Sequence, residues 1–182
     1  MRWNRTHMYV LDSSAFILGY ETKGPVVTIA EVFEELNGES IFRFESMKGA
    51  GMKLESPKKE TIKKIIQISE DTGDRNVLST TDIGLIATAF EIGGILVTDD
   101  YAMQNVAIEI GIEIEGIDKN IIKEKRIWIF KCQSCGRENK KNIDNCPVCG
   151  GEFRRKNSSR WNVWFYFMWD QQKNIGKREL RK

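Results

Sequence analysis

Short apolar runs alternate with amphipathic segments along the first two thirds of the chain. The runs that we interpret as buried strands are residues 8–11, 26–28, 95–98 and 112–117. Between them, apolar residues recur three and four positions apart, which is the spacing of one face of a helix. Strands that alternate with helices indicate a parallel sheet with helices on both of its faces, so the sequence predicts an α/β fold.

The expected helices have recognisable ends. They cover residues 13–18, 29–36, 57–72 and 101–110, and the segment between a cap at residues 79–81 and the glycines at 93 and 94. Ser56 and Pro57 suit the N-cap and the first turn of the third helix, and Gly73 is expected to end it. Residues 39–56 are ambiguous, because their glycines favour a loop whereas a strand is indicated by Ile41, Phe42 and Phe44.

Four acidic residues stand where strands end and helices begin. Asp12 ends the first strand and Asp100 follows the third, whereas Glu31 and Asp82 lie in the first turns of expected helices. In an open parallel sheet, the carboxyl ends of the strands and the N-termini of the following helices share one edge, where ligands bind. The pattern therefore predicts that the four carboxylates converge there.

Acids at helix N-termini also have a purely structural explanation, since they cap the helix and interact favourably with its dipole. This explanation suits Asp82, which follows two threonines, but Asp12 and Asp100 show no obvious capping need. A convergent cluster suits cations such as Mg²⁺, which prefer oxygen ligands and assist phosphodiester hydrolysis. Such a site needs no histidine, and the chain has a single one, His7. We therefore favour the metal site.

Four cysteines form two pairs with the spacing of metal ligands. Two residues separate Cys132 from Cys135, two separate Cys146 from Cys149, and ten lie between the pairs. Two such thiolate pairs complete a tetrahedral Zn²⁺ site, which is structural because every ligand comes from the protein. A redox dithiol is the weaker alternative, since two matched pairs point to a metal. The module has too little core to fold without its ion.

Charge is concentrated near the cysteines and beyond them. The net charge is only +2, but residues 151–182 hold nine Lys or Arg against three acids. The cations expected to contact the phosphates of a nucleic acid are Lys131, Arg137, Lys140, Lys141, Arg154, Arg155 and Lys156. Six aromatic residues crowd into residues 161–169. They could stack on bases, but we favour a strand packed on the cysteine module or a partner interface.

The expected location is the cytoplasm, and no membrane association is expected. No apolar run reaches the roughly 20 residues that cross a bilayer, and the apolar run at residues 8–11 is too short for a signal segment. In that reducing compartment the cysteines are expected to bind a metal rather than form disulfides.

Several of these segments resemble known nuclease motifs. The segments DSSAF at 12–16, TIAEV at 28–32, STTDI at 79–83 and VTDDY at 97–101 resemble the motifs of PIN-domain nucleases. More narrowly, residues 72–74, 78–82 and 99–107 are similar to the Nob endonuclease family, which joins a PIN domain to a zinc ribbon. The resemblance implies that a catalytic Mg²⁺ or Mn²⁺ is bound by Asp12, Glu31, Asp82 and Asp100, with Asp99 as an accessory candidate.

This resemblance implies a divalent-metal-dependent endoribonuclease that cleaves single-stranded precursor small-subunit (16S-type) rRNA at its 3′ end during ribosome biogenesis. Its expected partners are the pre-rRNA, the small-subunit precursor and assembly factors. The nuclease domain is expected over residues 1–120, the linker and zinc ribbon over 121–156, and a basic aromatic tail over 157–182. One alternative is a toxin-like PIN ribonuclease acting on tRNA or mRNA, against which the ribbon argues. Another is a non-catalytic RNA-binding assembly factor, against which the retained acids argue.

Overall fold

The computed structural model describes residues 8–118, 121–122, 126–139 and 143–160. Five strands form one parallel sheet in the order β3-β2-β1-β4-β5, which confirms the expected α/β fold. They are β1 (Tyr9–Leu11), β2 (Val26–Thr28), β3 (Lys53–Leu54), β4 (Ile95–Val97) and β5 (Ile114–Glu115). The strands β1, β2 and β4 are the most deeply buried, because helices cover both faces of the sheet.

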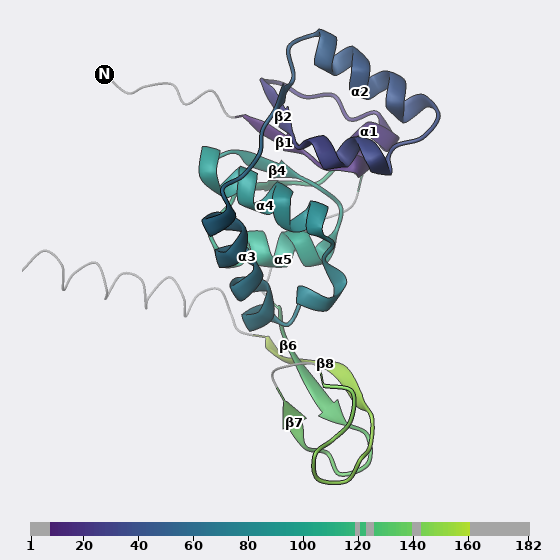
Figure 1. Cartoon of the computed structure of the whole chain (residues 1–182), viewed down its shortest axis with the longest axis vertical. Coiled ribbons are helices and arrows are strands. Elements are labelled where there is room, and N and C mark those ends of the chain that lie inside the picture. Colours follow the sequence, from purple (N-terminus) through teal and green to yellow (C-terminus); the bar gives the residue numbers. More distant parts are fainter. Residues whose placement is uncertain (1–7, 119–120, 123–125, 140–142, 161–182) are drawn as a thin grey trace, which may run out of the picture.

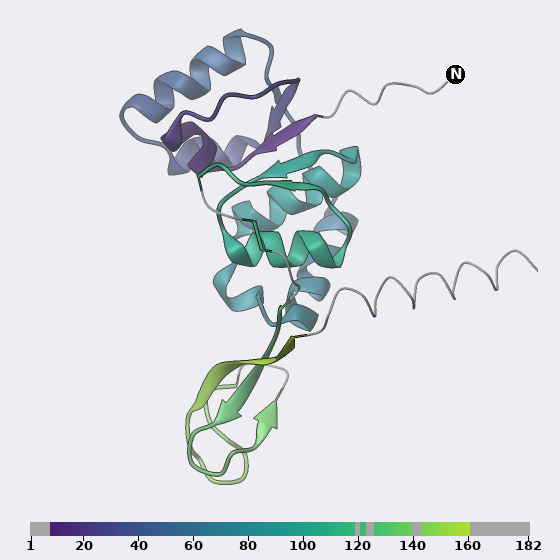
Figure 2. The same ribbon diagram turned by 180° about the vertical axis from the view of Figure 1, so that it is seen from behind.

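Helices lie on both sides of this sheet (Figures 1 and 2). They are α1 (Ser13–Leu18), the 3₁₀ helix η1 (Ala30–Glu35), α2 (Glu39–Gly49), α3 (Lys59–Thr72), the short η2 (Arg75–Val77), α4 (Thr80–Ile92) and α5 (Tyr101–Glu109). Figure 1 shows α1 and α2 on one side of the strands and α3, α4 and α5 on the other. The chain winds outward from β1 in one direction and from β4 in the other, so the strand order reverses between these two neighbours. Ligands of open α/β sheets bind at that reversal.

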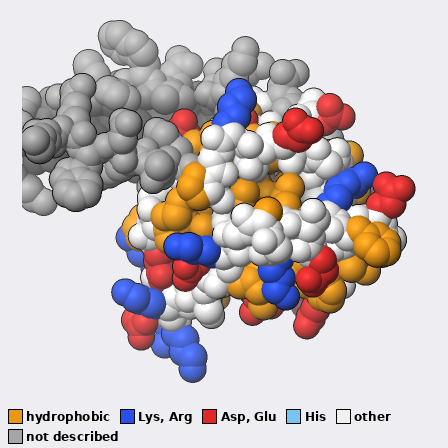
Figure 3. Space-filling view, turned by 90° about the horizontal axis from the view of Figure 1, so that it is seen from above, with side chains coloured by type: hydrophobic (Ala, Val, Ile, Leu, Met, Phe, Trp, Pro, Cys, Tyr) orange, Lys and Arg blue, Asp and Glu red, His pale blue; other side chains and the backbone are white. Residues whose placement is uncertain are grey.

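Residues 39–49 form the helix α2, so the strand and loop expected there are wrong. The inward positions are Ser40 and Phe44, four residues apart, and the Phe44 ring lies 5.2 Å from the ring of Phe16. The apolar residues that suggested a strand divide between the two faces of the helix, and Phe42 is 76% exposed. Figure 3 looks onto this end of the molecule, where apolar side chains reach the surface between charged ones.

Two other helix starts differ from expectation. The helix α3 begins at Lys59, after Pro57, and its N-cap residue Lys58 makes no side-chain cap. Instead, the backbone N–H of Lys58 donates to Glu91 of α4 at 2.8 Å, so a tertiary contact replaces the expected serine cap. The segment after β2 is a 3₁₀ helix, and no side chain caps its first turn.

A second, antiparallel sheet of order β7-β6-β8 lies at the opposite end of the molecule from α2 (Figures 1 and 2). Its strands are β6 (Arg126–Cys132), β7 (Glu138–Asn139) and β8 (Phe153–Arg160). Because β8 pairs with β6 as far as Arg160, this sheet includes the first residues of the expected tail. Residues 161–182, His7, Lys140 and Lys141 lie outside the described residues. Among the described helices, each is too short or too polar to cross a membrane.

Candidate functional site

Asp12 lies directly after β1, at the edge of the sheet where the strand order reverses. Its Oδ1 accepts a hydrogen bond from the backbone N–H of Ser13 at 2.6 Å, as an N-cap residue does. Its Oδ2 accepts from the hydroxyls of Ser14 and Thr98, each at 2.9 Å. Burial raises the pKa of Asp12, and these hydrogen bonds partly oppose that effect. The carboxylate is therefore held in one orientation.

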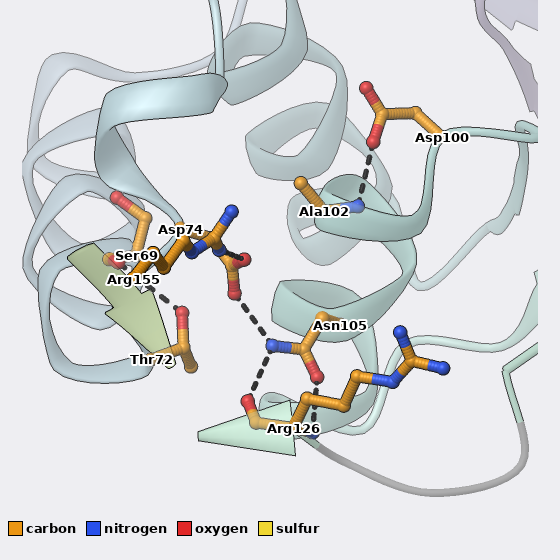
Figure 4. A network of polar contacts seen from close by, with 8 residues as sticks. All are labelled: Ser69, Thr72, Asp74, Asp100, Ala102, Asn105, Arg126 and Arg155. Carbon is orange, nitrogen blue, oxygen red and sulfur yellow. Dashed lines mark hydrogen bonds and ion pairs between the residues drawn. The ribbon is translucent and has the colours of Figure 1, made fainter. Parts of the chain in front are cut away.

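Thr98 connects Asp12 to Asp100. Its hydroxyl donates to Asp12 and accepts from the backbone N–H of Asp100 at 3.1 Å. Asp100 in turn caps α5, because its Oδ1 accepts from the N–H of Ala102 at 2.6 Å (Figure 4). Both Asp12 and Asp100 therefore cap helices, and the expectation that they have no capping need is wrong. Thr98 itself escaped the sequence analysis, since a threonine ending a strand gives no signal.

Asp82 reaches the same region from the first turn of α4. It forms a capping box with Ser79: its Oδ2 accepts from the Ser79 N–H at 2.7 Å, and the Ser79 hydroxyl accepts from the Asp82 N–H at 3.0 Å. Burial raises the pKa of Asp82, and the negative charges of Asp12 and Asp100 raise it further. Asp82 therefore lies close enough to both Asp12 and Asp100 to be affected by their charges, although the three acids come from distant parts of the chain.

The other two acids are placed differently. Glu31 is exposed in the first turn of η1, directly after the strand β2 that pairs with β1, and within the described residues its carboxylate has no hydrogen-bond partner. Asp99 is buried, and its carboxylate accepts from the backbone N–H groups of Ile117 at 2.8 Å and Asp118 at 3.1 Å. The side chain of Asp99 is therefore engaged with the loop after β5.

The four cysteines meet in one cluster, in which all four sulfur atoms lie within 4.8 Å of one another. The Sγ atoms of Cys132 and Cys149 are 3.4 Å apart, and those of Cys135 and Cys146 are 3.6 Å apart. Tetrahedral Zn²⁺ with bonds of about 2.3 Å needs sulfur separations of roughly 3.8 Å. Hydrogen bonds from the backbone N–H groups of Cys135 and Ser134 lower the pKa of Cys132 to about 6, which favours the thiolate that a metal binds. The cluster fits a metal ion.

The cations near the cysteines separate onto two faces of the second sheet. Directly paired residues of antiparallel strands share a face, and Lys131 pairs with Arg154 while Ile129 pairs with Lys156. These three cations therefore share one face. Arg155, paired with Phe130, lies on the other face and forms an ion pair with Asp74. Arg137 lies in the turn after the first cysteine pair, where its carbonyl accepts from the Cys132 N–H at 2.8 Å.

Comparison with known proteins shows the family to which the chain is related. Residues 9–92 match the family described as the PIN domain of ribonuclease. Endoribonuclease Nob1 of Methanocaldococcus jannaschii is 37% identical over 152 residues, which are 81% of this chain and 76% of that protein. Endoribonuclease Nob1 of Archaeoglobus fulgidus is 37% identical over 150 residues, which are 80% of this chain and 88% of that protein. A Thermoplasma acidophilum protein named ribonuclease VapC1 is 27% identical over 155 residues, 84% of this chain and 80% of that protein. The chain thus joins a PIN fold to a four-cysteine module and belongs to the Nob1 family of endoribonucleases.

Proposed function

We propose that this chain is a cytoplasmic, divalent-metal-dependent endoribonuclease that cuts single-stranded precursor small-subunit (16S-type) rRNA at its 3′ end. The observation that carries the proposal is the meeting of Asp12, Asp82 and Asp100 where the strand order of the sheet reverses. Membership of the Nob1 family supports the choice of substrate, which would be met in the precursor of the small ribosomal subunit.

The residues present suit Mg²⁺ or Mn²⁺. The charges of Asp12 and Asp100 act on Asp82, and a divalent cation would relieve that repulsion and take the oxygen ligands that it prefers. Glu31 would complete the set, because its carboxylate is exposed beside the same sheet edge. When bound, the cation would supply water activation and neutralise charge on the phosphate.

The polar residues around the acids would orient the carboxylates and would not themselves react with the RNA. Ser14 and Thr98 hold Asp12, so its oxygens need little rearrangement when a cation binds. The N-termini of α1 and α4 meet the same region, and the partial positive charge of their backbone N–H groups favours a phosphate there.

The cysteine module would hold one structural Zn²⁺ and contact RNA. Four thiolates are a suitable ligand set for Zn²⁺. The fold of so small a sheet would depend on binding of the ion. The face that carries Lys131, Arg154 and Lys156 supplies phosphate contacts that do not depend on base sequence. The acids would therefore cut RNA that the module helps to hold.

The test is cleavage of a single-stranded mimic of the pre-rRNA 3′ end in Mn²⁺, with and without chelator, followed by sequencing of the products. We expect one main cut that leaves 5′-phosphate and 3′-hydroxyl ends and that disappears with chelator. Tight binding of the mimic without cleavage would instead support a non-catalytic assembly factor.

The toxin-like alternative has one observation in its favour, the relative named ribonuclease VapC1. A map of cut positions in total RNA separates the two functions. Cuts at the 3′ end of precursor small-subunit rRNA support the proposal, whereas cuts confined to tRNA or mRNA would favour the toxin-like activity.

A further inference from the structure

An ion pair between a buried carboxylate and a partly exposed arginine joins the nuclease domain to the second sheet. Asp74, just after α3, is 1% exposed, and its carboxylate accepts from the guanidinium of Arg155 on β8 and from the amide of Asn105 on α5 at 2.6 Å. Burial raises the pKa of Asp74, whereas hydrogen bonds from Asn105 and Thr72 and the charge of Arg155 lower it. A buried charge with this many partners needs all of them in place, so the contact favours a single geometry.

Asn105 also holds the first residue of β6. Its amide donates to the carbonyl of Arg126 at 2.7 Å, and its carbonyl oxygen accepts from the backbone N–H of Arg126 at 2.7 Å. The side chain thus pairs with the strand as a neighbouring strand would (Figure 4). The adjacent Gln104 connects two segments of the chain. Its amide donates to the carbonyl of Thr98 and its carbonyl oxygen accepts from the N–H of Ile122, each at 2.9 Å.

Close packing accompanies these polar contacts. Gly73 ends α3 against Trp128 of β6, and a Cβ at this glycine would lie only 2.8 Å from the Cβ of Trp128. The guanidinium of Arg155 lies 4.2 Å over the Trp128 ring, which adds a cation–π contact to the ion pair. We call the contacts of Gly73, Asp74 and Asn105 with β6 and β8 the junction. Their close fit favours one orientation of the second sheet.

The helix α5 links this junction to the acids. Asp100 caps its N-terminus and Asn105 lies within it, so the two differ by about 7.5 Å along the helix axis at 1.5 Å per residue. A helix of this length between two hydrogen-bonded anchors is rigid. The position of Arg126 relative to Thr98 and Asp100 is therefore fixed while these hydrogen bonds are intact.

We propose that Asp74, Asn105 and Arg155 are positioning residues that set the cysteine module at one distance and angle from the carboxylates. RNA held by the module would then present one phosphodiester bond to the acids, so the junction selects the position of the cut. This inference rests on the proposed nuclease function. It also removes Arg155 from the residues expected to contact RNA, because its guanidinium is committed to Asp74 and Trp128.

Neighbouring arginines on opposite faces of β8 provide the matched test. Arg155→Ala breaks the junction, whereas Arg154→Ala removes the same charge from the outer face. Two substrates are compared: an oligonucleotide too short to reach the module and a long precursor mimic. For Arg155→Ala we expect unchanged cleavage of the short substrate. The KM for the long substrate should rise about tenfold, because the module is then held to the nuclease domain only by the linker. The cuts in the long substrate should spread over neighbouring bonds. Arg154→Ala should raise KM but keep the cut position.

The proposal would be overturned if both variants gave spread cuts. It would also be overturned if both kept a single cut position. If Arg155→Ala unfolds because Asp74 is left unpaired, the double variant Asp74→Asn/Arg155→Met removes both charges and should show the same spreading.

Backbone ¹⁵N relaxation tests the docking without any RNA. The two sheets should share one correlation time in the native protein and separate in the variant. Separate correlation times in the native protein would refute the inference. If the native protein shows a single correlation time but cuts no RNA, only the nuclease function is refuted.

Discussion

The Thr98 hydroxyl donates a hydrogen bond to Oδ2 of Asp12 at 2.9 Å, across 86 residues of sequence. The Thr98 hydroxyl oxygen in turn accepts a hydrogen bond from the backbone N–H of Asp100. One buried side chain at the end of β4 therefore orients an acid that follows β1 and positions another that begins α5. The two neighbouring strands between which the sheet reverses its order are joined at the point where a metal would bind.

Thr98→Val should weaken metal-dependent cleavage by about 10- to 100-fold, the usual cost of losing a group that orients a ligand. Valine has the same shape but leaves Oδ2 of Asp12 without this donor. Thr98→Ser keeps the hydroxyl and should retain most of the activity. Titration of the cleavage rate with Mn²⁺ measures the effect, and equal rates for the valine and serine variants would show that the hydrogen bond is unimportant.

Glu31→Gln should reduce cleavage while leaving stability unchanged, because its exposed carboxylate makes no hydrogen bond within the described residues. The matched control is Glu34→Gln, which removes an exposed charge from the same 3₁₀ helix. The assay is cleavage of the precursor mimic over a range of Mn²⁺ concentrations. Should both variants keep the native rate, Glu31 does not bind the catalytic metal.

Cys146→Ser should release the metal and unfold the second sheet while the α/β core remains folded. Its sulfur is buried beside that of Cys135, so no solvent-exposed ligand can replace it. Zinc content by mass spectrometry should fall from one ion per chain to none, and amide signals of β6 to β8 should collapse to unfolded positions. Retention of zinc would contradict the four-cysteine site.

Gly73→Ala and Gly93→Ala make a matched pair that isolates the junction. Both glycines end a helix with positive φ, 79° and 63°, and alanine costs about 1–2 kcal/mol in that conformation. Only at Gly73 would the added Cβ meet a neighbour, Trp128, so this variant should lose about 1–3 kcal/mol more. Equal free energies of unfolding in denaturant would show that the glycine at the junction carries no packing constraint.

The sequence predicted the parts of the fold that follow from local pattern. Apolar runs marked β1, β2 and β4, and the cysteine spacing indicated the cluster that the structure forms. The helix α2 was missed, because its exposed Phe42 imitates a strand residue and its inward face is set by packing against Phe16.

Tertiary partners explain what sequence reasoning missed at the site. The acids could be proposed from the sequence because each stands at a strand end or in the first turn of an expected helix. The roles of Thr98, Asn105 and Arg155 depend on residues that are distant along the chain. Arg155 illustrates the limit: beside other cations it resembles a phosphate contact, and only the strand register and the ion pair show that it lies on the face that contacts Asp74.

The acids themselves give the most direct test of the account. Asp12→Asn and Asp82→Asn keep an oxygen that can cap α1 and complete the Ser79 capping box, so both variants should fold. Each is compared with the native chain for cleavage of the precursor mimic in Mn²⁺ and for binding of the same RNA, with the exposed Asp71→Asn as control. We expect both variants to lose cleavage and keep binding. Cleavage at the native rate by either variant would contradict the assignment of these carboxylates to the catalytic centre.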